Sequence, residues 1–413
     1  MRTFLCWCFL FVTLGAFSQA PTATGESFIG FHWNSGRKSV EIPFELHANL
    51  VVIPLRINNS DTLRFLVDSG LGATLLTDTA VVTKLGLTSI RTVELNGLGI
   101  HKSLKAHVVI DTKLQVGPAY ALHQNLIYVN DDLLNLSSSI GTKIHGIIGY
   151  ELFANVVVTI DYAHSRLILT QPSRYRYKRR KGLRLPIDLT DNKPYLHQAG
   201  LTGLKGKLPN RLLMDTGAGH VLLVEASASD SAQFQLSKQR FNLGKGLNGP
   251  IIGRLGRVPA LEIGPWSWSQ VPATFPDSTA RKSADPWQAS LGGEFFRRFT
   301  LTFHYLDQYV VIKPVGRLWK KDFEYGMSGL GLRAIGPDFR KFVVETIHPD
   351  SPADVAGMLP GDEIWMINNK RVDQFRLGDI YRMLKKKEGS AIELMIRRER
   401  EFRLIRFRLR KLF

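Results

Sequence analysis

Residues 64–76 read RFLVDSGLGATLL, and residues 211–223 read RLLMDTGAGHVLL. The two stretches align without a gap, with an arginine, an aspartate, two glycines and a Leu-Leu pair in matching positions. A second matched pair follows, since residues 148–153 (IGYELF) align with residues 291–296 (LGGEFF). Two pairs of matched segments in the same order predict an internal duplication.

The residues around these matched segments have the composition of β-strands. Residues 40–170 contain short β-branched and apolar runs broken by Gly, Asn and Asp, and the same texture returns over residues 195–314. A basic, proline-flanked segment, residues 171–186, separates them. We therefore expect two homologous β-rich lobes joined by a short seam. Examples of the expected strands are Leu50–Ile57, Leu63–Val67, Ala106–Ile110 and Val156–Ile160.

Each copy presents one aspartate, Asp68 or Asp215, on a turn that follows an apolar strand. A single Asp-Ser/Thr-Gly tripeptide is ordinary turn chemistry and indicates little. Two of them in a duplicated frame can meet at a pseudo-twofold axis, where two close carboxylates share one proton. One aspartate then acts as general base on a water, while the protonated one polarises a peptide carbonyl. We predict these two residues as the catalytic pair.

Neighbours of the two aspartates have separate expected tasks. The hydroxyl residue after each aspartate can tie the two loops together across the axis. The next glycine permits a tight turn and leaves room for a peptide backbone. The glycine of the later segment lets another segment pack directly behind the aspartate loop, although a simple turn is the alternative for any one glycine. The predicted supporting residues are Ser69, Gly70 and Gly149 in the first copy and Thr216, Gly217 and Gly292 in the second.

The two Asp-Ser/Thr-Gly turns with their later apolar-Gly segments resemble the aspartic peptidase family, in a two-lobed, pepsin-like arrangement of retropepsin-like lobes. The resemblance covers residues 40 to 315 and implies barrel-type β lobes, a peptide cleft between them and a flexible hairpin flap. Gly97 and Gly99 in the first lobe, and Gly244 and Gly246 in the second, lie where flaps are expected. The flap tyrosine of pepsins has no clear counterpart.

In many members of this family a Ser or Thr lies three residues after one of the aspartates, and the sequence departs from that pattern. Leu71 and Ala218 occupy these positions, so a hydrogen bond that would stabilise the ionised form is lost. We expect higher apparent pKa values for the pair and a less acidic pH optimum than in pepsin. A pH-rate profile that peaks below about pH 3, under the ordinary aspartate pKa, would contradict this expectation.

The last part of the chain, from residue 325 onward, changes character. Its spaced segments, residues 351–353 (SPA), 356–358 (AGM) and 361–364 (GDEI), resemble those of PDZ domains. In that family, the stretch Gly329-Leu330-Gly331-Leu332 implies a loop whose backbone N–H groups bind a peptide carboxylate beside an added β-strand. A simple turn is the alternative interpretation of this stretch.

A helix is expected over Asp379–Lys387, with Ile380 and Leu384 lining the peptide groove of this domain. The strand before it is expected over Phe342–Ile347. The domain could bind a substrate tail, bind a partner or control access to the cleft.

Residues 1–20 are typical of a signal peptide, because Arg2 precedes an apolar run that ends in small residues. The alternative is an uncleaved anchor, but the run is shorter than the roughly 20 residues that a spanning helix needs. Both cysteines, Cys6 and Cys8, lie here, so we expect a mature chain without disulfides or cysteine metal sites. We expect an exported protein, periplasmic or secreted, in a bacterium, with no transmembrane span after cleavage.

Basic residues exceed acidic ones and give a formal net charge of +18. They concentrate in residues 174–184 and 397–411, and the second stretch alternates with apolar residues as a strand with one basic face would. A solvated face is one interpretation, and attraction to an anionic envelope surface is the other. Nucleic acid is not an expected partner of an exported chain.

Other chemistries find little support. His197 and His220 lie near the second aspartate, but no acidic companion stands at ligand spacing, so no metal site is expected. A Gly-x-Ser-x-Gly segment is absent, and the glycine pairs lack the lysine and helix of a phosphate-binding loop. We expect no cofactor.

The sequence thus predicts a mainly β chain, with two pseudo-symmetric acid-protease-type β-barrel lobes and a small α+β PDZ domain. The predicted function is that of an aspartic endopeptidase acting on peptides or proteins, with a PDZ domain that recognises C-terminal peptide tails. One chain supplies both aspartates, so a monomer is sufficient. The alternative is a catalytically inactive peptide-binding or scaffolding protein. Expected boundaries are 1–20 for the signal peptide, 21–175 and 185–316 for the lobes and 325–413 for the PDZ domain.

Overall fold

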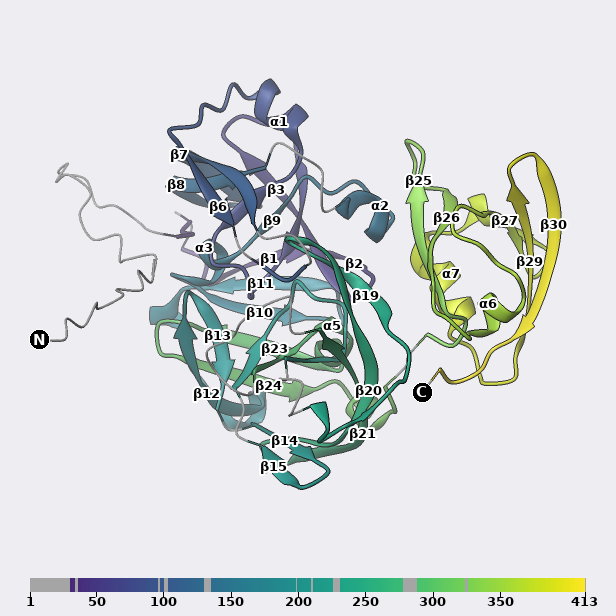
Figure 1. The fold of residues 1–413 in the computed structure, drawn as a ribbon. Coiled ribbons are helices and arrows are strands. Elements are labelled where there is room, and N and C mark those ends of the chain that lie inside the picture. The colour runs from purple at the N-terminus through teal and green to yellow at the C-terminus, as the bar shows by residue number, and fades with distance from the viewer. Residues whose placement is uncertain are drawn as a thin grey trace, which may run out of the picture.

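The computed structural model describes residues 30–33, 36–95, 97–99, 103–129, 135–197, 199–208, 211–225, 231–277, 288–323 and 326–412. The predicted signal peptide and both cysteines lie outside these residues. Strands dominate the described part of the chain, and they form two lobes with a smaller domain beside them (Figure 1). The prediction of a mainly β fold is confirmed.

The first lobe contains one eight-stranded sheet in the order β2-β3-β4-β9-β5-β8-β7-β6. A further pairing of β3 with β7 curls this sheet toward a barrel. Strand β4 is buried along almost its whole length, as its apolar sequence LRFLV predicts. The elements are β2 (Glu45–His47), β3 (Leu50–Ile57), β4 (Leu63–Val67), β5 (Thr74–Leu76), β6 (Arg91–Leu95), β7 (Leu104–Val116), β8 (Ala119–Tyr128), β9 (Gly146–Ile148), α1 (Thr79–Lys84), α2 (Leu136–Ile140) and α3 (Tyr150–Phe153).

The second lobe repeats the part of this plan that carries the aspartate. β22 lies between β16 and β17 as β9 lies between β4 and β5, with the same parallel and antiparallel partners. The long strand β20 pairs with β14, β18, β19 and β21. The elements are β13 (Lys193–Leu196), β14 (Ala199–Gly203), β15 (Gly206–Leu208), β16 (Arg211–Met214), β17 (Leu222–Glu225), β18 (Gln235–Leu236), β19 (Phe241–Gly246), β20 (Gly249–Ile263), β21 (Trp266–Pro276), β22 (Gln288–Leu291) and α5 (Gly293–Phe296).

A run of six strands, β1-β11-β10-β23-β24-β12, joins the two lobes. Thr159 of β10 and Thr302 of β23 are partners at its centre, and their hydroxyl oxygens lie 2.9 Å apart. They are separated by 143 residues, the same offset that relates Gly149 to Gly292, so each is the counterpart of the other. The pseudo-twofold axis therefore passes between these threonines. The strands are β1 (Ser39–Pro43), β10 (Val157–Asp161), β11 (Arg166–Thr170), β12 (Leu183–Thr190), β23 (Phe299–His304) and β24 (Tyr309–Pro314).

The C-terminal domain has its own sheet, β25-β26-β27-β29-β30, and β25 is an edge strand. Helix α7 (Leu377–Leu384) begins two residues before the predicted helix, because the Asp379 carboxylate accepts the Arg376 backbone N–H and so belongs to the first turn. The other elements are β25 (Leu330–Ile335), β26 (Lys341–Ile347), β27 (Glu363–Ile367), β28 (Lys370–Arg371), β29 (Ala391–Arg398), β30 (Glu401–Arg408) and α6 (Pro352–Val355).

One hydrophobic core runs through both lobes, whereas the C-terminal domain has a separate core. The linker between them packs on the second lobe through its 3-10 turn η3 (Leu318–Lys320), where Trp319 lies against Trp266 and Trp268. Among the described residues, no helix combines the length and the apolar character needed to cross a bilayer. The remaining 3-10 turns are η1 (Pro172–Arg174), η2 (Arg179–Lys181) and η4 (Val372–Gln374).

Candidate active site

The structure brings the two predicted aspartates together at the axis between the lobes. Asp68 follows β4 and Asp215 follows β16, and each backbone N–H donates a 2.9 Å hydrogen bond to the last residue of the strand behind it, Ile148 or Leu291. The two carboxyl groups lie within hydrogen-bonding reach of each other. Two loops of one chain therefore form a single paired site.

Hydroxyl groups connect the two loops in a nearly symmetric way. The Ser69 backbone N–H donates to Thr216 Oγ1 at 2.9 Å, and the Thr216 backbone N–H donates to Ser69 Oγ at 3.1 Å. Each hydroxyl also donates to a carbonyl of the opposite lobe, Met214 for Ser69 and Val67 for Thr216. Both hydroxyl residues are 1% exposed. Because all four bonds cross the axis, they fix the separation of the aspartates.

The glycine after each hydroxyl residue lies against the opposite carboxylate. A Cβ on Gly217 would lie 2.2 Å from Asp68 Cγ, and a Cβ on Gly70 would lie 2.9 Å from Asp215 Cγ. Sequence reasoning assigned these glycines to a tight turn and to room for a substrate backbone. Neither has a positive φ, and the space they leave is filled by the partner aspartate. They are required by the close approach of the two loops.

Each aspartate also accepts a backbone N–H within its own loop. The Gly70 N–H donates to Asp68 Oδ1 at 2.7 Å, and the Gly217 N–H donates to Asp215 Oδ1 at 2.9 Å. These bonds hold each carboxylate in one orientation, and they favour its ionised form.

Burial raises the pKa of both carboxyl groups. The pKa of Asp215 lies well above its ordinary value, first because burial disfavours the charged form and then because the charge of Asp68 repels it. Burial also raises the pKa of Asp68, and the N–H of Gly70 partly offsets this effect. The Lys193 ammonium lowers the pKa of both. The raised pKa values favour a pair of carboxyl groups that retains one proton, and general acid-base chemistry on a peptide bond requires such a pair.

Gly149 and Gly292 lie directly behind the two aspartate loops. A Cβ on Gly149 would lie 2.3 Å from the Leu71 carbonyl oxygen, and a Cβ on Gly292 would lie 2.8 Å from the Ala218 carbonyl oxygen. A side chain at either glycine would therefore push an aspartate loop toward the axis. Leu71 and Ala218, which stand where a Ser or Thr was expected from the resemblance, thus contact these glycines through their backbone carbonyl groups.

The four predicted flap glycines lie on two hairpins whose tips meet. Gly97 and Gly99 lie between β6 and β7, while Gly244 and Gly246 belong to β19. A Cβ on Gly99 or on Gly246 would lie 2.2 Å from the backbone of the other hairpin. The Asn248 N–H donates to the Leu98 carbonyl at 2.9 Å across this contact. The glycines therefore let the two tips interlock.

The predicted carboxylate loop of the C-terminal domain leads into the edge strand β25. Gly329 has a φ of +81°, and a Cβ there would lie 2.0 Å from Ser351 Oγ. The N–H of Leu330 donates to the Ser328 hydroxyl at 3.2 Å. Two of the backbone N–H groups assigned to a peptide carboxylate, those of Leu330 and Leu332, thus already have partners inside the domain.

The residues of α7 that were predicted to line the peptide groove are buried. Ile380 and Leu384 are 0% and 1% exposed and pack in the domain core. Tyr381 is the α7 residue that reaches the edge strand, where its hydroxyl accepts the Leu332 N–H at 2.8 Å and donates to the Leu332 carbonyl at 3.2 Å. Apolar spacing located the buried face of the helix, and Tyr381 lies on the face toward β25.

The two histidines near the second aspartate have structural partners. His220 lies 3.1 Å from the Ser290 hydroxyl, and burial lowers its pKa to about 4, so the ring is neutral at physiological pH. His197 pairs with Asp188 across the β12–β13 hairpin, an acidic companion that the sequence did not indicate. No group of three His, Cys, Asp or Glu suited to a metal occurs among the described residues.

Two residues near the aspartates were missed by sequence reasoning. Lys193 acts on both carboxyl groups, and it follows its hairpin turn as Leu50 follows the equivalent turn of the first lobe. The ungapped alignment at the aspartates pairs Lys193 with Leu46 instead, so that alignment did not single it out. Tyr305 has a buried hydroxyl with no hydrogen-bond partner among the described residues. Burial and the charge of Asp68 raise its pKa well above the ordinary value. No sequence signal singled it out.

Two pseudo-symmetric β lobes that each deliver an aspartate to a shared axis define an aspartyl-protease-type fold. The family model described as "Aspartyl protease" matches residues 53–152 and again residues 202–295, one match in each lobe. The model described as "PDZ domain" matches residues 343–398. Each lobe is therefore similar to aspartyl proteases, and the C-terminal domain is similar to PDZ domains.

One curated relative is carboxyl-terminal-processing peptidase 2, chloroplastic, of Arabidopsis thaliana. It is 44% identical over 63 residues, which are 15% of this chain and 12% of the relative. The chain thus spans about an eighth of the length of that relative. A match of this length corresponds to one small domain, so the similarity does not extend over a pair of lobes.

Proposed function

We propose that this protein is an aspartic endopeptidase that hydrolyses peptide bonds with the Asp68/Asp215 pair. The observation that carries the proposal is the paired site itself, in which four hydrogen bonds across the axis hold two carboxyl groups in contact. The raised pKa of both groups supports a shared proton. The aspartyl protease match in each lobe supports the same chemistry.

The proposed reaction needs only groups of the two loops and a water. The ionised aspartate takes a proton from a water, and the oxygen of that water attacks the peptide carbonyl carbon. The protonated aspartate donates a hydrogen bond to the carbonyl oxygen as negative charge develops there. The tetrahedral intermediate then collapses, the C–N bond breaks, and a proton passes to the leaving amine. A substrate lies between the aspartates and the two flap hairpins.

Asp68→Asn and Asp215→Asn test this proposal. We expect wild-type protein to cleave a mixed peptide library and each variant to lose at least about a thousandfold in kcat/KM, because each removes one partner of the acid-base pair. Cleavage that persists in both variants would refute the proposed mechanism. Absence of cleavage by the wild type at every pH from about 3 to about 8 would support the alternative of a peptide-binding or scaffolding protein.

We also propose that the protein is exported and that one chain is sufficient for activity. The apolar N-terminal segment with Arg2 supports export. The supply of both aspartates by one chain supports a functional monomer. N-terminal sequencing of protein recovered outside the cytoplasm should find the segment before residue 21 removed. Sedimentation at the assay concentration should show that the active species is monomeric.

A further inference from the structure

The PDZ domain contacts the flap hairpin of the second lobe directly. The Lys245 ammonium of β19 lies 2.8 Å from the Glu345 carboxylate of β26, and both side chains are only about a quarter exposed. The ring of Phe241, at the start of β19, lies 4.7 Å from the ring of His348. The first strand of the flap hairpin is therefore held at both ends by residues of the PDZ domain.

The tip of the same hairpin closes on the first lobe. Asn248 donates its N–H to Leu98 in the opposite flap. Leu247 packs against a hydrophobic cluster of the first lobe, and Leu71, three residues after Asp68, packs against the same cluster. The hairpin thus connects the PDZ domain to the surroundings of the aspartate pair.

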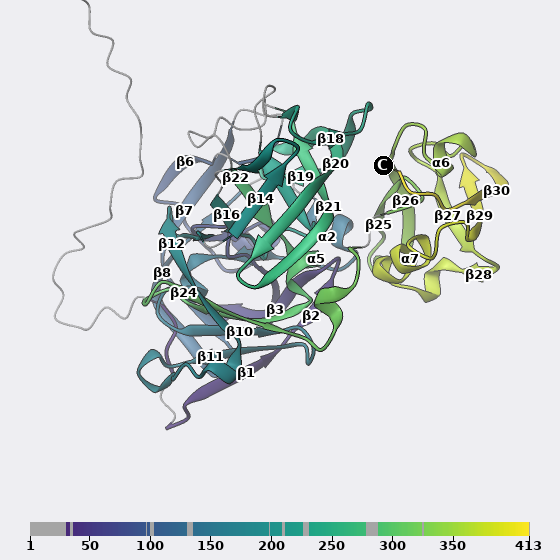
Figure 2. The same cartoon turned by 90° about the horizontal axis from the view of Figure 1, so that it is seen from below.

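A second contact reaches the PDZ domain from the first lobe. Helix α2 lies beside the edge strand β25, as both views show (Figures 1 and 2). A Cβ on Gly141, the residue after α2, would lie 2.7 Å from Leu377 Cβ at the start of α7. Leu136 and Ile140 of α2 belong to the cluster that receives Leu247. Both contacts of the PDZ domain therefore lead to one cluster beside the flap tip.

The segment that precedes the PDZ domain is bound to the second lobe. Arg298, 3% exposed, donates hydrogen bonds to the carbonyl groups of Leu318 and Asp322 at 3.1 and 3.0 Å. Its guanidinium also lies 4.0 Å from the centre of the Phe323 ring. The linker is therefore fixed to the second lobe as far as residue 323.

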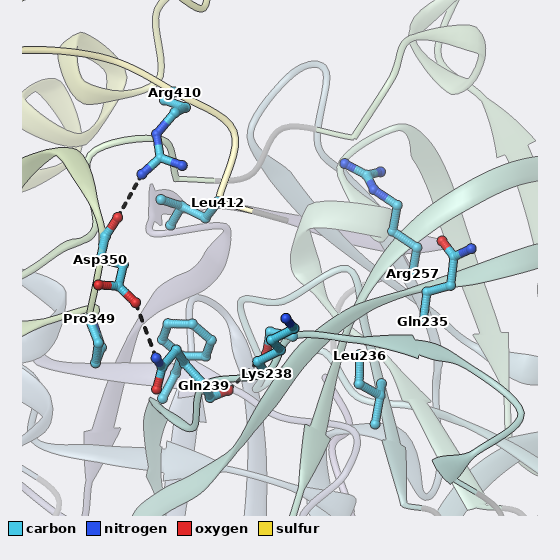
Figure 3. Close-up of a pocket in the computed structure, with 11 residues that line it drawn as sticks. Gln235, Leu236, Lys238, Gln239, Arg257, Pro349, Asp350, Arg410 and Leu412 are labelled. Carbon is cyan, nitrogen blue, oxygen red and sulfur yellow. Dashed lines mark hydrogen bonds between the residues drawn. The ribbon is translucent and has the colours of Figure 1, made fainter.

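The interface around these contacts is open. A cleft of about 330 Å³ lies between β18, β19 and the PDZ domain, where Asp350 accepts a hydrogen bond from Gln239 at 3.1 Å (Figure 3). Arg410, near the C-terminus, donates to the Asp350 carbonyl at 2.6 Å. The PDZ domain thus holds the hairpin through a few polar and ring contacts, which can be broken without disrupting a packed core.

We propose that the PDZ domain is a clamp that holds the flap hairpin of the second lobe closed against the first lobe. Breaking the Lys245–Glu345 and Phe241–His348 contacts frees β19 and separates the flap tips. If the proposed function is correct, the clamp limits access of substrate to Asp68 and Asp215. The position of the clamp itself does not depend on that function.

Hydrogen–deuterium exchange of the full chain tests the clamp without any assay of activity. Lys245→Glu and Glu345→Lys each place like charges at the contact, and we expect amide exchange over residues 241–253 to rise about fivefold in each. The double variant K245E/E345K restores opposite charges and should return exchange to the wild-type value. His348→Ala, which removes the ring contact from the PDZ side, should raise exchange over the same residues.

A matched control lies elsewhere on the second lobe. Lys207 and Glu262 form an ion pair of the same 2.8 Å length between β15 and β20, so Lys207→Glu should leave exchange over residues 241–253 unchanged. Exchange over β29 and β30 should stay unchanged in every variant, which shows that the PDZ domain remains folded. Unchanged exchange of the flap in Lys245→Glu, Glu345→Lys and His348→Ala would overturn the proposal.

The same variants separate the clamp from the proposed function. If both are correct, Glu345→Lys should raise kcat/KM for a short peptide severalfold, and the double variant should restore the wild-type value. A rise in flap exchange without cleavage by any variant would retain the clamp and refute the peptidase. Cleavage by the wild type, with no change in flap exchange in the variants, would retain the peptidase and refute the clamp.

Discussion

Two hairpin turns, one from each lobe, occupy equivalent places across the pseudo-twofold axis. The β2–β3 turn presents the Ala48 carbonyl oxygen 2.7 Å from the position of a Cβ on Gly219, in the aspartate loop of the second lobe. The β12–β13 turn presents the Asp191 carbonyl oxygen 3.1 Å from the equivalent position on Gly72 in the first lobe. Each lobe thus supports the aspartate loop of the other through backbone contacts, which the duplication has kept in both copies.

The side chains around these shared backbone contacts differ between the lobes. Leu50 follows the first turn and Lys193 follows the second. Glu151 of the first lobe accepts a hydrogen bond from Thr74 at 2.8 Å, whereas its counterpart Glu294 pairs with Arg298 and helps to hold the linker. The backbone contacts that position the aspartate pair are therefore symmetric. The charges near the pair, and the segments that the two equivalent glutamates hold, differ between the lobes.

The largest expected effect comes from filling the space between the two loops. In Gly217→Ala, the new Cβ would collide with Asp68 Cγ, and we expect kcat/KM to fall at least about a thousandfold. Gly70→Ala meets Asp215 at a longer distance of 2.9 Å, so its loss should be smaller. Peptide cleavage assays on both variants measure the difference between the loops.

Gly378→Ala provides the control for these substitutions. Gly378 lies in α7, has no positive φ, and a Cβ there would meet nothing within 4 Å. Cleavage should stay at the wild-type level in this variant. Equal losses in Gly70→Ala and Gly217→Ala would show that the loops are closer to symmetric than the structure indicates.

Replacing the two equivalent glutamates, Glu294 and Glu151, should give the next largest effect, which is on the free energy of unfolding. Glu294→Gln removes the charge opposite the buried Arg298 and should lower the free energy of unfolding by about 3 kcal/mol. Glu151 lacks an arginine partner of this kind, and burial raises its pKa, so its neutral form is favoured. Glu151→Gln should therefore cost less than about 1 kcal/mol, because an amide replaces a carboxyl group of the same shape. Chemical denaturation of both variants measures the two costs.

The pH dependence of Glu151 sharpens the same comparison. A carboxyl group with a raised pKa stabilises the fold fully below its unfolded value of 4.5, and this stabilisation is lost as the pH rises through the folded value. Glu151→Gln should gain stability relative to the wild type as the pH rises above 4.5 and should show no relative gain below it. A relative gain that grows toward low pH would contradict the raised pKa.

Sequence reasoning predicted the repeated parts of the molecule well. The expected strands Leu50–Ile57 and Leu63–Val67 coincide with β3 and β4, because each is a continuous apolar run between turns. Asp68 and Asp215 were predicted as a pair because the two copies could be aligned against each other. A single copy of either loop would have been indistinguishable from an ordinary turn.

The contacts between distant segments could not be predicted in this way. The Lys245–Glu345 pair joins residues that are 100 positions apart and belong to different domains, so no periodicity connects them. Tyr381 shows the same limit within one domain, since its hydroxyl replaces the peptide backbone that the edge strand was expected to bind. Local patterns specify strands and turns, whereas side-chain partners across a fold depend on how the elements pack.

The smallest expected effect concerns the charge that distinguishes the two turns. Lys193 lowers the pKa of both aspartates, so Lys193→Leu, which copies Leu50 of the first lobe, should raise both values. The pH profile of kcat/KM should then move upward on its acidic and its basic side, with the maximal rate little changed. Leu50→Lys places an ammonium at the matching position across the axis and should move the profile downward. The two backbone turns are equivalent. Shifts of the pH profile that are similar in size and opposite in sign in the two variants would therefore show that the two turns differ in their effect on the aspartates only through this charge. An unchanged profile in Lys193→Leu would mean that another contact of this lysine, rather than its charge at the aspartates, accounts for its place in the second lobe.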